Sequence, residues 1–138
     1  MLIDLNTEFG RRVARRLQEE RVIWFTTVRN DRTPQPTPVW FLWNGESLLI
    51  FSRPQAQKLR NITYNEKVAL NFDGDQRGGD IVIFWGDAEL EKGTPAGEIE
   101  QYMAKYQEGL KRIGMTSEEF ARSYSVAIRV RPVRLIGH

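Results

Sequence analysis

The spacing of apolar and polar positions changes several times along the chain, and each change predicts a new element. From Thr7 to Glu20 the apolar residues Phe9, Val13 and Leu17 recur at every fourth position. This period is typical of an amphipathic surface helix. The stretch Val22 to Val28, with the sequence VIWFTTV, is instead dense in β-branched and aromatic residues and indicates a core strand.

The next segment carries prolines in a pattern that restricts how it can pair. Thr33 to Pro38 has proline at every second position, and proline lacks the backbone N–H that a sheet ladder needs. Such a strand has to lie at a sheet edge or face a ligand. It runs directly into Val39 to Trp43, and Asn44-Gly45 then predicts a tight hairpin leading to a strand over Ser47 to Phe51.

A change of pattern after Phe51 predicts a short helix. Ser52, Pro54 and Gln55 have the spacing of a capping serine, a first-turn proline and a capping-box glutamine. We therefore expect a helix that starts there and runs to about Ile62.

The second half of the chain predicts three further strands and two helices. The strands cover Lys67 to Phe72, Asp80 to Leu90 with a bulge at Gly86, and Val126 to Leu135 with a phase shift at Pro132. The helices cover Thr94 to about Leu110 and a shorter piece that opens with a capping box at Thr116 and Glu119. Six antiparallel strands in one domain, residues 1–138, favour a small barrel with helices packed outside.

Composition narrows the chemistry mainly by what it lacks. The chain has 138 residues, a net charge of +2, no cysteine and a single histidine, His138. Disulfides, thiolate metal sites and cysteine nucleophiles are excluded, and histidine acid–base chemistry is disfavoured at a chain end. Asp73, Asp75 and Asp80 do not fit a calcium-loop spacing, so no metal is expected. An enzyme of this composition would take its reactivity from a cofactor.

The chain contains no apolar run long enough for a membrane span, and its first residues do not have the pattern of a secretory leader. We expect a cytoplasmic protein without a membrane partner. The arginines between Arg11 and Arg16 are flanked by glutamates, which is more typical of a solvated helix face than of a nucleic-acid patch.

The strongest candidate site lies where the hairpin ends. Ser52, Arg53 and Lys58 would bring a hydroxyl and two cations to a helix N-terminus, which is suited to a phosphate. The neighbouring segment Thr37 to Trp40 offers an aromatic face for a planar ring. The alternative is purely structural, with Ser52 and Gln55 capping the helix and the two cations solvated.

Other conspicuous residues predict less. The glycine-rich loop Gly74 to Asp80 permits close approach of a ligand or a second subunit, but it does not match a Walker phosphate loop. Among the tryptophans, Trp24 and Trp43 are expected in the core or at a dimer interface. Trp40 is the one expected at a ligand.

Three segments resemble a known family: Thr33 to Ile62 with its SRPQAQKLRN motif, Asn71 to Leu90, and Lys105 to Leu135 with YSVAIRVRPVRL. The chain is similar to the pyridoxamine-5′-phosphate-oxidase-like split β-barrel family, most of all to its small single-domain branch that uses the deazaflavin coenzyme F-420 (8-hydroxy-5-deazaflavin). This resemblance implies a mainly β, six-stranded antiparallel split barrel of the FMN-binding type. It further implies a homodimer with a flavin or deazaflavin in each of two clefts at the interface.

The resemblance also implies which residues bind the cofactor. The strand from Pro36 to Trp40 would run along the ring, and Phe51, Ser52, Gln57 and Lys58 would hold the phosphate and ribityl chain. Arg53 is an additional candidate, and Asp80 matches a further contact position. These cofactor-binding candidates are Pro36, Thr37, Pro38, Val39, Trp40, Phe51, Ser52, Arg53, Gln57, Lys58 and Asp80.

The expected function is therefore an oxidoreductase that uses coenzyme F-420 for hydride transfer to an unidentified small substrate. One alternative is an FMN-binding reductase or oxidase, since only the anionic F-420 tail calls for extra cations such as Arg53, Arg60 and Arg77. Another is a non-catalytic flavin or deazaflavin carrier. No catalytic acid or base is assigned. The histidine and arginine segment of true pyridoxamine-phosphate oxidase is lacking, so that activity is not expected, and haem is disfavoured because His138 is the only histidine.

Overall fold

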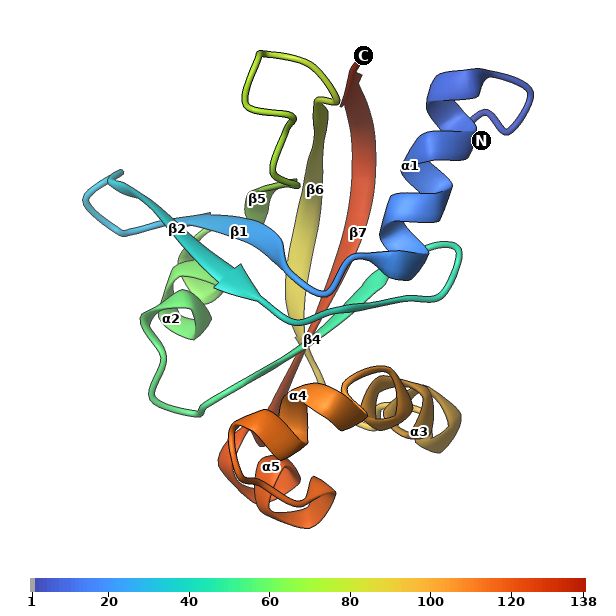
Figure 1. Ribbon diagram of the computed structural model, residues 1–138. Helices are drawn as coiled ribbons and strands as arrows, with labels where there is room; N and C mark the ends of the chain where they lie inside the picture. The colour runs from blue at the N-terminus through green and yellow to red at the C-terminus, as the bar shows by residue number, and fades with distance from the viewer. Residues whose placement is uncertain (1) are drawn as a thin grey trace.

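A computed structural model describes residues 2–138, in which one curled antiparallel sheet is surrounded by helices (Figure 1). Its strands are β1 (Ile23–Val28), β2 (Pro34–Val39), β3 (Leu42–Trp43), β4 (Leu48–Ser52), β5 (Lys67–Asn71), β6 (Val82–Glu91) and β7 (Val126–Gly137). Its helices are α1 (Glu8–Glu19), α2 (Gln57–Tyr64), α3 (Ala96–Lys105), α4 (Gln107–Arg112) and α5 (Ser117–Ser123). The strand order is β2-β1-β5-β6-β7-β4-β3, so β7 joins two unequal parts of the sheet.

Several elements form where the sequence predicts them, and local residues explain why. Thr7 caps α1 by accepting a hydrogen bond from the Gly10 N–H, and Val13 and Leu17 are buried. The proline-rich strand β2 pairs with β1 alone and forms one edge of the sheet, which confirms the edge prediction. The register of β6 shifts at Gly86, where a β-carbon would lie 2.6 Å from the Arg131 carbonyl oxygen, so the bulge is confirmed as well.

The sheet has seven strands where six were predicted, because the expected strand ending at Trp43 breaks at Trp40 and Phe41. Both backbone groups of Phe41 bind a helix side chain. The Tyr106 hydroxyl lies 2.8 Å from the Phe41 nitrogen and 3.0 Å from its carbonyl oxygen, and Lys105 Nζ donates to the same carbonyl. These contacts replace the ladder hydrogen bonds that would have continued the strand.

The helix predicted to start at Ser52 starts at Gln57 instead. Ser52 is still part of β4 and pairs with Val126, and its hydroxyl donates to the Arg53 carbonyl rather than capping a helix. A turn closed by the Ala56 N–H and the Arg53 carbonyl separates the strand from α2. The predicted capping box is therefore wrong, and α2 has no side-chain cap.

The helix predicted over Thr94 to Leu110 is interrupted at Tyr106, which leaves helical geometry with φ −104° and ψ 20°. The kink lets Tyr106 reach Phe41, and Gly109 then lies against Trp40, where a β-carbon would be 3.0 Å from the indole. The following capping box at Thr116 and Glu119 is present, as predicted.

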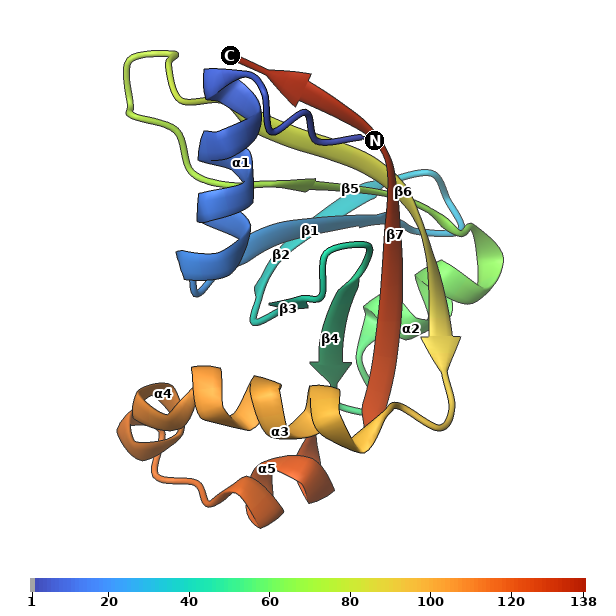
Figure 2. The same ribbon diagram turned by 90° about the vertical axis from the view of Figure 1, so that its right-hand side faces the viewer.

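Figure 2 shows α3, α4 and α5 together at one end of the sheet; we call residues 96–124, which end at the C-cap of α5, the helical arm. Aromatic side chains of the arm pack on β3, β4 and β7 and form a second core beside the barrel interior. Arg129 of β7 also attaches the arm to the sheet. Its side chain is 4% exposed and forms ion pairs with Glu91 at the end of β6, at 2.7 Å, and with Glu98 of α3, at 2.9 Å. Hydrogen bonds from Arg129 hold the pKa of both carboxyls below the usual value. Within residues 2–138, no helix is long and apolar enough to cross a membrane.

Candidate functional site

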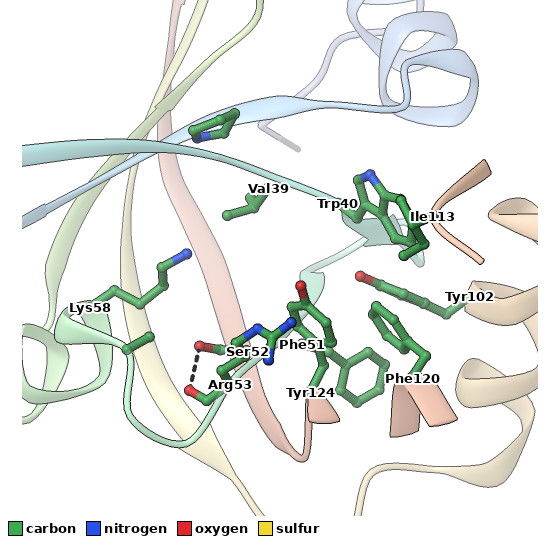
Figure 3. Close-up of a pocket in the computed structure, with 12 residues that line it drawn as sticks. Val39, Trp40, Phe51, Ser52, Arg53, Lys58, Tyr102, Ile113, Phe120 and Tyr124 are labelled. Atoms are coloured by element: carbon green, nitrogen blue, oxygen red, sulfur yellow. Dashed lines mark hydrogen bonds between the residues drawn. The ribbon is translucent and has the colours of Figure 1, made fainter. Parts of the chain in front are cut away.

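A cavity of about 360 Å³ lies between the end of β2, the end of β4, the start of α2 and the helical arm (Figure 3). Two parts of the chain with different chemistry face each other across it. The lining residues are Pro38, Val39, Trp40, Phe51, Ser52, Arg53, Ala56, Lys58, Tyr102, Ile113, Phe120 and Tyr124.

One side of the cavity is cationic. Lys58 extends from the first turn of α2 into the cavity, and Ser52 and Arg53 lie at the adjoining end of β4 (Figure 3). No carboxylate among residues 2–138 forms an ion pair with Lys58, and its partial burial lowers the pKa of the amine. A partly desolvated cation without a counter-charge favours binding of an anion there.

The opposite side is aromatic, and its rings are stacked. Trp40 stacks on Tyr106 with ring centroids 4.5 Å apart and on Phe120 at 5.6 Å. Phe120 in turn stacks on Tyr124 at 4.5 Å, and the Arg53 guanidinium lies 4.7 Å from the centre of the Tyr124 ring. A ligand that carries both a planar ring and an anionic group matches this cavity, with the ring against the aromatic side and the anion against the cationic side.

The structure brings most of the sequence-predicted cofactor residues to this cavity. The seven that line it are Pro38, Val39, Trp40, Phe51, Ser52, Arg53 and Lys58. Thr37 and Gln57 make other contacts: the Thr37 hydroxyl is 3.4 Å from the Phe25 carbonyl oxygen, and the Gln57 amide donates to Asn61 at 2.9 Å.

Asp80 lies apart from the cavity lining, next to α1. Arg12 and Arg16 bind its carboxylate at 2.8 and 3.3 Å. Its backbone has a positive φ of 53°. Contact between Asp80 and a cofactor stays a prediction, and so do the roles of Pro36, Thr37 and Gln57.

Sequence reasoning missed the four lining residues from the helical arm: Tyr102, Ile113, Phe120 and Tyr124. Tyr102 lies within the helix predicted over Thr94 to Leu110, but nothing in the sequence indicated which part of the sheet that helix would cover. The correctly predicted cap at Thr116 fixed the start of α5, and hence the phase that buries Phe120. Among residues 2–138, no three side chains of the metal-binding types are grouped to hold an ion.

The outer face of the sheet next to the cavity carries exposed apolar side chains, with Arg134 paired beside Trp85. Cross-strand register places Pro36, Thr26, Ala69 and Trp85 in one row, since directly paired residues share a face. Trp85 is 48% exposed and Val133 is 64% exposed. The cavity residue Pro38 pairs with Trp24 and so belongs to this same face.

Comparison with protein families gives one match. The family model described as pyridoxamine 5′-phosphate oxidase matches residues 9–137. By sequence, none of the curated proteins matches this chain.

Solved structures give clear matches over nearly the whole chain. A protein described as an F420 reductase is 25% identical, with a TM-score of 0.67, and the match covers 87% of this chain and 92% of that one. A putative pyridoxamine 5′-phosphate oxidase from Listeria innocua is 21% identical, with a TM-score of 0.67 and coverage of 91% and 94%. The haem storage protein HutZ from Vibrio cholerae is 15% identical, with a TM-score of 0.71 and coverage of 95% of each chain.

Proposed function

This chain belongs to the pyridoxamine 5′-phosphate oxidase family, and from that premise we propose that it is an oxidoreductase using the deazaflavin coenzyme F-420 to transfer hydride to a small substrate. The observation that carries the proposal is the cavity in which the unpaired cation Lys58 lies opposite the stacked rings around Trp40. Similarity to a protein described as an F420 reductase supports deazaflavin as the cofactor.

The residues present fit such a cofactor. Lys58 and Arg53 would bind the phosphate as charge-assisted donors, and the buried Ser52 lies beside them. Trp40 and the β2 residues Pro38 and Val39 would orient the ring, while Phe120 and Tyr124 keep water from that side of the cavity. The cofactor supplies the hydride chemistry when bound.

Two other functions share this site. An FMN-dependent reductase or oxidase would use the same three polar residues for its single phosphate. A non-catalytic carrier is favoured by one observation, that the cavity lining contains no histidine and no carboxylate. Turnover with the reduced cofactor separates the carrier from the two enzymes.

The proposal includes a homodimer, because the apolar row on the outer sheet face runs up to the cavity. Exposed patches of this kind mark protein interfaces. A second copy packed on Trp85 and Val133 would cover the side of the cavity at Pro38.

A fluorescence titration of the cofactor-free protein with F-420 and, in parallel, with FMN tests the cofactor assignment. Trp40 lines the cavity and is expected to be quenched by either ligand. Tight F-420 binding with weak FMN binding supports the proposal. The reverse preference moves the protein to the FMN-dependent alternative, and binding of neither refutes both.

Replacing Lys58 tests the phosphate position in the same titration. We expect Lys58→Ala to weaken cofactor binding by about 10- to 150-fold, because a hydrogen bond to a charged group contributes about 1.5–3 kcal/mol. Lys111→Ala is the control, since Lys111 is exposed on α4 and outside the cavity. An unchanged affinity in Lys58→Ala would place the phosphate elsewhere.

A further inference from the structure

A buried asparagine joins α2 to the two strands that the helix covers. Asn61 is 1% exposed, and its Nδ2 donates to Thr27 Oγ1 of β1 and to Gln35 Oε1 of β2, each at 2.9 Å. Its Oδ1 accepts a hydrogen bond from the Gln57 amide, also at 2.9 Å, and the Gln57 oxygen accepts from Arg60. None of these side chains lines the cavity, so the network lies beside the candidate site rather than in it.

The network connects the two elements that a cofactor would have to bridge. Lys58 precedes Asn61 by one helical turn and extends from α2 toward Val39 of β2 (Figure 3). Gln35 is on the same strand as Pro38 and Val39, which line the cavity. The hydrogen bond from Asn61 to Gln35 therefore links the helix that carries the cation to the strand that would contact the ring.

Strand β2 depends on such a link more than an inner strand would. It is an edge strand that pairs with β1 alone. Pro34, Pro36 and Pro38 have no backbone N–H to donate, so half of its residues contribute no donor to a ladder. A hydrogen bond to a buried side chain of α2 adds a restraint that the backbone of β2 does not supply.

We propose that Asn61 is a positioning residue that acts through Gln35 and sets the distance between the amine of Lys58 and the ring-contacting end of β2. A ligand that engages both sides of the cavity gains affinity when the two elements are already in place, because binding does not have to order them. A ligand that engages one side gains little. The inference rests on the proposed function and adds to it a residue outside the cavity that favours ligands with both a ring and a phosphate.

The two acceptors of the Asn61 amide supply matched variants. Gln35→Met and Thr27→Val each remove one acceptor and keep the size of the side chain, but β1, which carries Thr27, contributes no residue to the cavity lining. We expect Gln35→Met to weaken F-420 binding about 3- to 10-fold, because an indirect effect cannot exceed the strength of the one hydrogen bond that transmits it. Thr27→Val should bind F-420 within about 2-fold of the wild type, although loss of a buried hydrogen bond lowers its stability.

A second ligand separates positioning from a general loss of structure. The dephosphorylated chromophore of F-420 keeps the deazaflavin ring and the ribityl chain but has no phosphate for Lys58 to bind. We expect Gln35→Met and Asn61→Ala to bind this alcohol within about 2-fold of the wild type, while their affinity for F-420 falls. Fluorescence titration measures both ligands, and circular dichroism shows that each variant is folded. If FMN is the tighter ligand of the wild type, FMN and riboflavin form the corresponding pair.

A double-mutant cycle identifies the path of the effect. If Asn61 acts through Gln35, the protein carrying both Asn61→Ala and Gln35→Met should lose no more F-420 affinity than Asn61→Ala alone. Independent contributions would multiply the two losses and would contradict the proposed path. Gln35 is only partly buried, so Gln35→Met tests the proposal even where Asn61→Ala does not fold.

The outcomes assign failure to one proposal or the other. Equal losses for F-420 and the alcohol, equal losses in Gln35→Met and Thr27→Val, or an unchanged F-420 affinity in Gln35→Met would each overturn the inference and leave the proposed function standing. Absence of binding of both F-420 and FMN to the wild type would overturn the proposed function, and the inference with it.

Discussion

The hydroxyl of Tyr106 holds the interruption between β2 and β3, and this interruption places Trp40 in the cavity lining. It lies within 3.0 Å of both backbone polar groups of Phe41 and 2.8 Å from the Arg21 carbonyl oxygen. The chain turns there, and Trp40 stacks on Tyr106 in the cavity wall instead of continuing a strand. One residue of the helical arm thus determines where a tryptophan of the sheet is presented.

The neighbouring amine of Lys105 gives a prediction for the dependence of stability on pH. Burial, with a smaller effect of Arg21 opposed by Glu20, lowers the pKa of Lys105 to about 8 from the ordinary 10.5. Between these two values the unfolded chain binds the proton and the folded chain does not, so the free energy of unfolding gains a contribution that rises with pH. That contribution is fully present above pH 10.5 and is lost as the pH falls through about 8.

We expect Lys105→Met to flatten this rise. Urea unfolding of the wild type and of Lys105→Met, from about pH 8 to 10.5, measures how the free energy of unfolding changes with pH. Lys111→Met, at an exposed lysine of α4, should keep the slope of the wild type. Identical slopes in wild type and Lys105→Met would show that Lys105 does not titrate differently in the folded protein.

Residues of the cationic side could be predicted from sequence, while those of the arm could not. Ser52, Arg53 and Lys58 lie within seven positions of one another, so local chain geometry brings them together whichever element they occupy. Tyr124 and Phe120 reach the same cavity only because the arm packs on β4 and β7, which is a non-local contact. No periodicity in the sequence encodes that docking.

At the level of elements, competition between local sequence preference and contacts distant in sequence explains the two wrong helix boundaries. Ser52 and Gln55 have the pattern of a cap, but pairing of Ser52 with Val126 extends β4 through the serine. The long helix breaks because the Tyr106 side chain gains hydrogen bonds to Phe41. In both cases a partner distant in sequence prevailed over a weak local preference, while the capping box at Thr116 and Glu119, which meets no such partner, formed as predicted.

The attachment of α3 to the sheet depends on the buried guanidinium of Arg129. We expect Arg129→Met to lower the free energy of unfolding by about 3–5 kcal/mol, because Glu91 and Glu98 lose the charge that compensates their partial burial. Arg131→Met is the matched control on the same strand, since the Arg131–Glu89 pair is exposed and such pairs contribute at most about 1 kcal/mol. Chemical denaturation measures both, and equal losses would contradict the assignment.

At the scale of the whole molecule, the apolar row on the outer sheet face predicts a dimer that a single charge disrupts. We expect Trp85→Glu to be monomeric and to bind cofactor more weakly, because the contact would lose the apolar indole and would have to desolvate a carboxylate in its place. Leu5→Glu, at an exposed residue ahead of α1, should keep the mass of the wild type. Light scattering gives the mass, and a monomeric wild type that binds cofactor tightly would refute the dimer.

The position of β7 in the sheet has a consequence for how the protein is made. The β3–β4 hairpin joins the other strands only through β7, which is the last strand in chain order. A nascent chain on the ribosome can form β1, β2, β5 and β6 early, but β4 has no long partner until residues 126–137 have been synthesised. We therefore expect cofactor capture to be post-translational, with the hairpin exposed to chaperones until then.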